Sequence, residues 1–360
     1  MDSSPPVSQR AIARKLGLSQ ATVSMALAGH PQVSAETKKA VLAVAEELAY
    51  RPDPALRSLA RYRRSIADPT FHATLAWVHN WPSADSWRSA AVFNTVFTAA
   101  EARAQRLGYK LENFWLNPGH LSANRASKIL HNRGIRGLLL VPPASPSKPI
   151  PALDWDKFCA VNLLNHSQEL RPFLHEIGAD HFANLRLTLQ RLALLGYKRP
   201  ALITSQSLEV GMISQGYISA YLGYQTAIPN SKWPPVLWHE TLTKEIFAAW
   251  LKRHKPDVLM LSYALESYGR IFTWLHELGL KIPQDVGVAM LCLRDTSRSN
   301  PPHAPADLSG IDECFADLGL RSVDFLVHLL ENFERGSTDM PIRKIITGRW
   351  HEGSTLRTLL

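Results

Sequence analysis

The first fifty residues constrain the fold of this 360-residue chain more than any other segment, because they hold the start and stop signals of short helices. Ser8 precedes a helix-favouring run that ends at Gly17, and Ser19 precedes a second run, Gln20–Ala28, that stops at a glycine. Serine often caps a helix N-terminus and glycine often ends a helix, so this pattern predicts two short helices joined by a tight turn. Ser34 starts a third predicted helix, in which apolar residues recur at helical spacing (Val41, Val44, Ala45 and Leu48).

Two helices joined by a short turn form a helix-turn-helix, which places its second helix in the major groove of DNA. With Val23 and Leu27 facing inward, the outer face of the second predicted helix carries small or polar side chains and one thioether. Such groups suit phosphate oxygens, base edges and the thymine methyl. The predicted DNA-contacting residues of this helix are Ser19, Gln20, Ala21, Thr22, Ser24 and Met25. An ordinary helical bundle with a polar face is the alternative that the spacing leaves open.

Positive charge is concentrated near the N-terminus. Residues 1–64 carry ten Lys or Arg against five Asp or Glu, and the whole chain has a formal net charge of +9. A basic segment beside a helix-turn-helix favours a polyanionic partner. All ten Trp lie beyond residue 64, so we expect the N-terminal segment and the remainder to be different domains.

Several function classes are disfavoured by what the sequence lacks. The three cysteines are widely spaced and match neither a disulfide framework nor a zinc site. The N-terminus has no apolar signal core, and no apolar run reaches the roughly 18–20 residues that span a bilayer. No phosphate-binding glycine loop, metal motif or nucleophile motif occurs, and the 14 His are scattered. We therefore expect a cytoplasmic protein with no membrane association, no cofactor, no metal site and no enzymatic activity.

A short basic segment, residues 52–64, follows the third predicted helix. Asp53 can cap a new helix with Pro54 at its first position, where a missing N–H is harmless. This helix, residues 54–61, has only two turns, and isolated helices shorter than about 12–15 residues are marginal in water. We therefore expect it to be frayed in the free protein and to form on DNA, with Leu59 as a minor-groove wedge and Leu56 beside it. The alternative is a basic linker that contacts phosphates without order.

The same residues carry a family resemblance, because four short motifs occur in a fixed order. They are A-T-V-S at Ala21–Ser24, V-S-x-x-T at Val33–Thr37, Y-x-P at Tyr50–Pro52 and R-S-L at Arg57–Leu59. In this order they closely resemble the DNA-binding headpiece of LacI/GalR-type bacterial transcription regulators.

The resemblance implies a headpiece over residues 1–51, a hinge helix or linker over residues 52–64 and an effector-binding and dimerisation domain over residues 65–360. It adds Thr37 and Arg57 to the predicted DNA contacts, and it implies that Gln20 and Ala21 begin the recognition surface. Met25 stands where the family usually has an arginine that can reach guanine. We therefore expect an operator that differs from the common half-site at that base.

Beyond about residue 73, short β-rich apolar runs alternate with helical stretches. The predicted strands are TLAWV, YKLENFW, GLLLV, PALIT, DVLML and VGVAML, and the predicted helices are residues 93–107, 123–132 and 266–278. This alternation is typical of parallel sheets flanked by helices, and about 290 residues are too many for one such sheet. The predicted fold class is therefore α/β, with two periplasmic-binding-protein-like lobes of doubly wound parallel sheet, preceded by a small all-α helix-turn-helix domain.

The resemblance also implies a ligand cleft between the lobes, at the carboxyl ends of their strands. Three polar positions of sugar-binding members are replaced here, by Ile213, by Tyr263 with Ala264, and by Cys292. Aromatic faces bind by area and stacking, which suits a glycan, a glycoside or an apolar ligand. The predicted effector-binding residues are Trp81, Trp87, Phe93, Ile213, Tyr217, Tyr263 and Cys292. Two alternatives stay open: the aromatic residues only pack the lobes, or effector binding has been lost.

Taken with the resemblance, these features predict a transcription regulator, with repression as the default. A homodimer would bind a near-palindromic operator in double-stranded DNA, and a small-molecule effector, with a sugar or glycoside as the candidate, would modulate that binding. The alternatives are a solute- or sugar-binding protein, which would carry a secretion signal and no basic helix-turn-helix, and a DNA-binding regulator without an effector. An enzyme of sugar metabolism fused to a headpiece would need catalytic carboxylates or a phosphate-binding loop.

Overall fold

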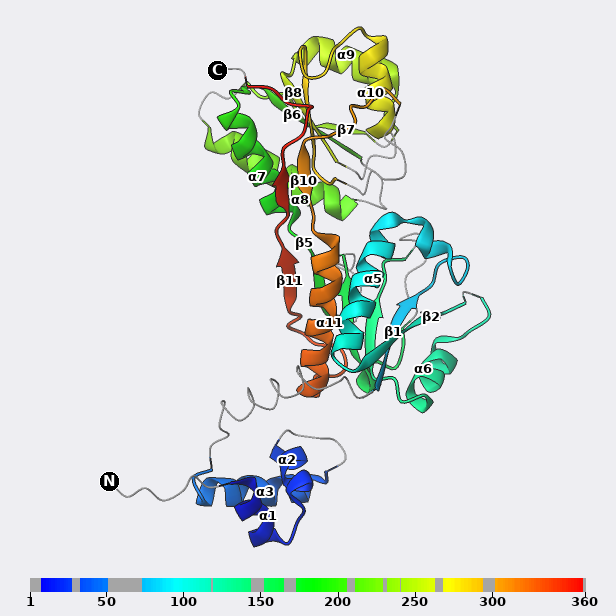
Figure 1. The fold of residues 1–360 in the computed structure, drawn as a ribbon, viewed down its shortest axis with the longest axis vertical. Helices are drawn as coiled ribbons and strands as arrows, with labels where there is room; N and C mark the ends of the chain where they lie inside the picture. Colours follow the sequence, from blue (N-terminus) through cyan, green and yellow to red (C-terminus); the bar gives the residue numbers. More distant parts are fainter. Residues whose placement is uncertain are drawn as a thin grey trace, which may run out of the picture.

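The computed structural model of the chain describes residues 8–27, 33–50, 73–117, 119–143, 152–164, 173–205, 211–228, 232–239, 241–262, 268–293 and 302–358. An N-terminal headpiece of three helices comes first, α1 (Gln9–Leu16), α2 (Gln20–Leu27) and α3 (Ala35–Glu47). Two lobes follow, each built on a six-stranded sheet (Figure 1). The predicted fold class is confirmed.

The headpiece helices begin and end largely where the cap residues predict. Gly17 ends α1 in the left-handed conformation, with a φ of 66°, which glycine adopts without a steric penalty. Ser19 and Ser34 each accept a hydrogen bond from the backbone N–H three residues further on, as predicted. Ser8 occupies the N-cap position of α1 but makes no side-chain cap hydrogen bond, so its predicted capping role is wrong. The three helices enclose a small core of Ile12, Ala13, Val23, Ala26, Val33, Val41 and Ala45.

The first lobe is built on an all-parallel sheet of order β11-β5-β4-β3-β1-β2. Its strands are β1 (Ala73–His79), β2 (Tyr109–Trp115), β3 (Gly137–Leu140), β4 (Cys159–Leu163), β5 (His175–Ala179) and β11 (Arg343–Ile346). Its helices are η1 (Ser86–Ser89), α5 (Ala91–Arg106), α6 (Ala123–Asn132), η2 (Trp155–Lys157) and α11 (Phe315–Glu331).

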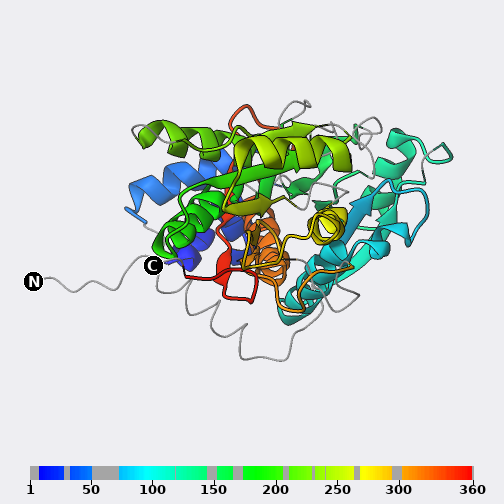
Figure 2. The same cartoon turned by 90° about the horizontal axis from the view of Figure 1, so that it is seen from above.

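The second lobe is built on a sheet of order β12-β10-β9-β8-β6-β7, parallel except that β12 runs antiparallel to β10. Its strands are β6 (Pro200–Ser205), β7 (Leu237–His239), β8 (Val258–Leu261), β9 (Gly287–Met290), β10 (Gly310–Asp312) and β12 (Arg349–His351). Its helices are α7 (His181–Leu194), α8 (Gly211–Ala227), α9 (Lys244–His254) and α10 (Tyr268–Glu277), and Figure 2 shows the helices of both lobes around the strands.

Strands covered by helices on both faces should be apolar throughout. The strands β3 and β8 have this character, with every residue buried. The six predicted strands correspond to β1, β2, β3, β6, β8 and β9, and the predicted helices at residues 93–107 and 123–132 correspond to α5 and α6. The first residues of the helix predicted at 266–278 lie outside the described residues, and the rest forms α10.

Three chain crossings connect the two lobes. The chain passes from β5 into α7 at Ala179–His181, from β10 into α11 at Asp312–Phe315, and from β11 into β12 at Ile346–Arg349. The helix α11 and the strand β11 therefore return to the first lobe, although they follow the second lobe in sequence (Figure 1). In the first lobe α11 packs directly against α5.

Candidate nucleic-acid interface and interlobe site

The outer face of α2 carries three exposed residues of the predicted DNA-contacting set, Gln20, Ala21 and Ser24. The hydroxyl oxygens of Ser19 and Thr22 lie 2.8 Å apart, and Ser19 Oγ also accepts from the backbone N–H of Thr22. These two hydroxyls therefore hydrogen-bond each other at the start of α2.

Met25 differs from its predicted placement. It is half-buried and packs against the headpiece core, so it does not lie wholly on the outer face as expected. The predicted inward residue Leu27 is also only half-buried, whereas Ala26 is buried in the core. The inward face of α2 is therefore rotated slightly toward Ala26 relative to the expectation.

Two side-chain contacts tie the headpiece helices together. Arg10 Nε donates to Gln20 Oε1 at 3.1 Å, which connects α1 to the start of α2. Lys15 forms an ion pair with Glu47 and so connects α1 to α3. Thr37 Oγ1 lies 2.8 Å from the cap oxygen of Ser34, so this predicted DNA contact also hydrogen-bonds at a helix start.

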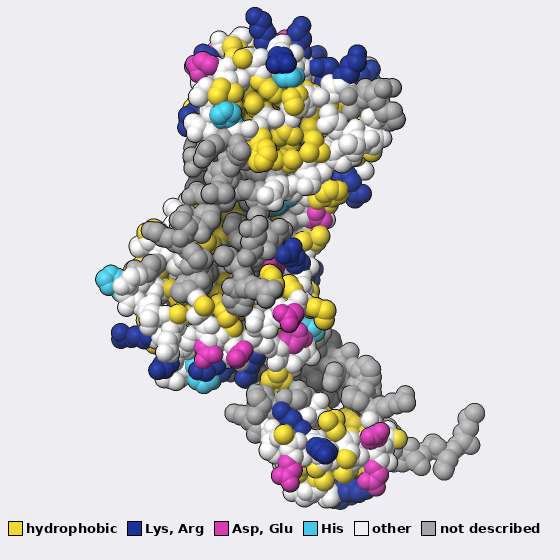
Figure 3. All heavy atoms as spheres, turned by 180° about the vertical axis from the view of Figure 1, so that it is seen from behind, with side chains coloured by type: hydrophobic (Ala, Val, Ile, Leu, Met, Phe, Trp, Pro, Cys, Tyr) yellow, Lys and Arg dark blue, Asp and Glu magenta, His cyan; other side chains and the backbone are white. Residues whose placement is uncertain are grey.

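The charge of the headpiece itself is moderate. Residues 8–27 and 33–50 carry five Lys or Arg and three Asp or Glu, and both signs appear on the face shown in Figure 3. Half of the ten Lys and Arg residues of residues 1–64 are the arginines of residues 51–64. The predicted hinge residues Leu56, Arg57 and Leu59 lie in that segment, outside the described residues, so the hinge helix stays a prediction.

In the first lobe, two predicted effector residues contact each other at the carboxyl end of β1. The rings of Trp81 and Phe93 pack edge to face, with centroids 5.5 Å apart, and both side chains are partly buried. Trp81 Nε1 donates to the backbone oxygen of Pro142, just beyond β3, at 2.9 Å. Trp81 follows the carboxyl end of β1, and contact of this pair with an effector stays a prediction.

Trp87 has a different environment. It is fully buried in the core of the first lobe, where its ring contacts Trp77 and Phe97 with centroids 5.4 and 5.1 Å away. These contacts agree with the alternative in which this aromatic residue packs the lobe. His79 lies beside it, and burial lowers the pKa of this imidazole to about 4.

In the second lobe, the predicted effector residues Tyr217 and Cys292 are buried. The Tyr217 hydroxyl lies 3.2 Å from the backbone oxygen of Leu291 and 3.2 Å from Glu313 Oε1, so its single O–H is shared between these two acceptors. The side chain of Ile213 and the whole of Tyr263 lie outside the described part of the chain.

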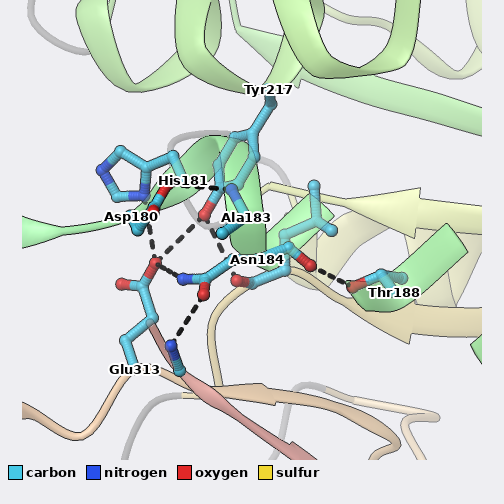
Figure 4. A network of polar contacts seen from close by, with 9 residues as sticks. Asp180, His181, Ala183, Asn184, Thr188, Tyr217 and Glu313 are labelled. Carbon is cyan, nitrogen blue, oxygen red and sulfur yellow. Dashed lines mark hydrogen bonds and ion pairs between the residues drawn. The ribbon is translucent and has the colours of Figure 1, made fainter. Parts of the chain in front are cut away.

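A buried polar network joins all three interlobe crossings, and it was not predicted (Figure 4). Asn184, on α7 after the first crossing, donates from Nδ2 to Glu313 Oε1 in the second crossing at 3.2 Å. Its Oδ1 accepts from the backbone N–H of Gly348, in the third crossing, at 2.8 Å. His181 Nδ1 lies 3.1 Å from the same oxygen of Glu313. One asparagine thus connects the three points at which the lobes join.

The carboxylate of Glu313 is the centre of this network. Glu313, Asn184 and Tyr217 are all 0% exposed. Glu313 Oε1 faces hydrogen-bond donors from α7 and α8, whereas Oε2 is buried without a hydrogen-bond partner among the described residues. A buried carboxylate without its partners is costly, so the surrounding donors hold the crossing in one arrangement.

A cavity of about 510 Å³ lies between the lobes near the second and third crossings. The first lobe contributes Thr95 and the start of α11, and the second lobe contributes residues beside β9, β10 and β12. Across it, Arg349 of β12 pairs with Asp317 of α11 at 3.4 Å. Of the predicted effector residues whose side chains the structure describes, none lines this cavity. It is therefore a second candidate location for an effector. The residues that line it come from separate segments of the chain and form no recognisable sequence motif.

Two features of the described residues bear on other functions. No group of three or more His, Cys, Asp or Glu side chains in that part of the chain could hold a metal ion. None of the described helices combines the length and apolar character needed to cross a bilayer.

The headpiece and lobes define a class of protein: a helix-turn-helix domain followed by a two-lobed, periplasmic-binding-protein-like fold. Residues 10–53 match the family model described as "Bacterial regulatory proteins, lacI family". The N-terminal domain of this chain is thus a lacI-family helix-turn-helix, and the resemblance stated from its motifs is confirmed.

A curated relative matches the same segment. It is the HTH-type transcriptional regulator AglR of Rhizobium meliloti (strain 1021), which is 51% identical over 55 residues. This alignment spans 15% of our chain and 15% of the length of that relative.

Solved structures match the whole chain in fold. The lac repressor dimer bound to operator and the anti-inducer ONPF has a TM-score of 0.52 and 18% identity, and the match covers 98% of our chain and 100% of that one. The transcriptional regulator CelR in complex with cellobiose has a TM-score of 0.53 and 18% identity, with 97% and 99% covered. The entire chain therefore shares its fold with these two proteins.

Proposed function

We propose that this chain is a DNA-binding transcription regulator, a repressor by default, and not an enzyme. The observation that carries the proposal is the lacI-family headpiece, whose α2 exposes Gln20, Ala21 and Ser24 on one face. Small polar side chains on a recognition helix contact phosphates and base edges in the major groove. The protein would act in the cytoplasm, where its DNA is.

The proposed assembly is a homodimer that binds a near-palindromic operator. Two headpieces related by a twofold axis present two α2 helices to half-sites about one helical turn apart. The lac repressor, whose fold this chain shares, was solved as a dimer bound to operator. The hinge residues Leu56, Arg57 and Leu59 would enter the minor groove between the half-sites, with Leu59 as the wedge.

A small molecule bound between the lobes would modulate DNA binding, with a sugar or glycoside as the candidate. Trp81 and Phe93 at the carboxyl end of β1 supply the aromatic surface that stacks on a sugar ring. The similar fold of CelR holds cellobiose. Closure of the lobes would move the two hinge segments, and such coupling is typically about 1–3 kcal/mol and reciprocal.

The regulator proposal is tested with the full chain on labelled DNA from its own upstream region, across a salt series. We expect a retarded complex, protection of a symmetric site and a steep loss of affinity as salt rises, because released counterions drive phosphate binding. A random-sequence duplex of equal length is the control. Equal affinity for both duplexes at physiological salt would contradict the proposal.

The hinge is tested by Leu59→Ala in the same assay. Loss of the wedge should weaken operator binding much more than binding to the random duplex, because only the operator complex is kinked.

The effector is tested by a thermal-shift screen of mono- and oligosaccharides against the full chain, followed by Trp81→Ala for any sugar that raises the melting temperature.

A further inference from the structure

A hydrogen bond between Arg10 and Gln20 joins α1 to the first residue of α2. Arg10 is the second residue of α1, Gln20 is the first residue of α2, and both are exposed. Arg10 Nε donates to Gln20 Oε1 at 3.1 Å. The contact therefore lies at the end of α2 that a helix-turn-helix presents to base edges.

The chemistry of the contact settles which amide atom points away from α1. A guanidinium has donors only, whereas the glutamine amide has an acceptor oxygen and a donor nitrogen. The atom held by Arg10 is therefore the oxygen, and the Nε2 group with its two N–H bonds is the one left to face a ligand. The guanidinium of Arg10 carries further N–H groups, which are donors as well.

This orientation matters because glutamine reads adenine through both amide atoms. In that contact Nε2 donates to N7 and Oε1 accepts from N6 of the base. The bond from Arg10 uses one lone pair of Oε1 and turns this oxygen toward α1, so the groups left to face a base are mainly donors. Guanine is the base whose major-groove edge offers two acceptors, N7 and O6, and no donor.

Because Met25 brings no hydrogen-bond donor to α2, the donors of Arg10 and Gln20 become more important for base recognition. Its thioether carries no hydrogen-bond donor, and the side chain is half-buried against the headpiece core. Arg10 and Gln20 are exposed, long side chains that bring donors to the start of α2.

We propose that Arg10 is a positioning residue for base recognition: it holds Gln20 so that the pair reads guanine rather than adenine at one symmetric pair of operator positions. The proposal rests on the proposed function as a DNA-binding regulator. It adds the chemistry of one base contact and the residue that sets it.

The test is selection of operators by the full chain from a library of randomised symmetric duplexes, followed by sequencing. Wild type should select guanine at one symmetric pair of positions. Arg10→Ala should reduce the guanine preference there by about tenfold or more and raise that of adenine, because the amide is then free to turn. Arg10→Lys keeps a cationic donor and should retain the guanine preference.

Arg14→Ala is the matched control, because it removes the same charge from an exposed position one turn further along α1. It should weaken binding to all sequences alike and leave every base preference unchanged. Gln20→Ala should also remove the guanine preference. If Arg10 had only a structural role, Arg10→Ala would lower the affinity for all sequences without changing the base preference.

The outcomes separate the inference from the function on which it rests. A wild-type chain that selects no site at all overturns the regulator function and the inference with it. A wild-type chain that selects a symmetric site whose base preferences survive Arg10→Ala overturns the inference alone. Selection of adenine by wild type at the position that responds to Gln20→Ala would do the same.

Discussion

In the headpiece the polar side chains proposed for function lie on the surface, whereas in the two lobes the main polar network is buried where the chain crosses between them. Gln20 and Arg10 are exposed, and Asn184 and Glu313 are 0% exposed. An exposed group can be exchanged at little cost in stability, but a buried one leaves its partners unsatisfied. Substitutions of the exposed headpiece residues should therefore change DNA recognition with little change in stability. Substitutions at the crossings should lower the free energy of unfolding.

The largest expected effect is at Gly319, where α11 packs against α5. A Cβ at this position would lie 2.2 Å from the backbone oxygen of Val96, a distance that only a backbone shift could relieve. Gly319→Ala should therefore lower the free energy of unfolding by about 3 kcal/mol, the cost of overpacking. Urea denaturation measures it.

Gly223→Ala on α8 is the control, since nothing lies within 4 Å of the added Cβ. It should be neutral or raise stability by up to about 1 kcal/mol, because alanine favours a helix. Equal destabilisation by the two substitutions would mean that helix packing in the lobes is not as tight as described.

Asn184→Ala should lower the free energy of unfolding by about 2–3 kcal/mol. It removes the donor to Glu313 and the acceptor of the Gly348 N–H, and it leaves buried groups without partners. Asn332→Ala, at an exposed helix end, should change stability by less than about 0.5 kcal/mol. Similar values for both variants would show that the crossing network does not differ from a surface contact.

His79 makes the stability of the first lobe depend on pH. Burial lowers its pKa from 6.5 to about 4, so the unfolded chain binds a proton that the folded lobe does not. The free energy of unfolding is therefore highest above pH 6.5 and decreases as the pH falls toward 4. The decrease between pH 7.5 and pH 5 should be about 2 kcal/mol. Urea denaturation at both pH values, with His79→Gln alongside, measures it. The same pH dependence in both proteins would rule out this imidazole as the cause.

The smallest effect is expected in the headpiece. Ser34→Ala should destabilise α3 by about 1 kcal/mol, because the cap hydrogen bond from Thr37 N–H is lost. Ser8→Ala should change little, since Ser8 makes no cap hydrogen bond. Hydrogen exchange of the α1 and α3 amides in the full chain compares the two. A larger loss at Ser8 would reverse the assignment of the caps.

Local signals in the sequence determined the headpiece and, in the lobes, six strands and the helices α5, α6 and α10. Caps such as Ser34 and the terminal Gly17 act on residues three or four positions away, so residues close in sequence are enough to predict where a helix begins and ends. The strands β1 and β8 are apolar runs bounded by polar residues, and they were predicted for the same reason. The helix α11 was not predicted, although its apolar residues recur at helical spacing.

Other features were decided only by the tertiary structure. The strands β7, β10 and β12 have three residues each, too few for a periodic pattern. Asn184 meets Glu313 across 129 residues of sequence and Gly348 across 164, and Arg10 meets Gln20 across a turn. Such contacts depend on which elements pack together. The sequence by itself thus determined the kind of each domain, whereas packing decided which buried carboxylate joins the lobes and which arginine hydrogen-bonds Gln20 at the start of α2.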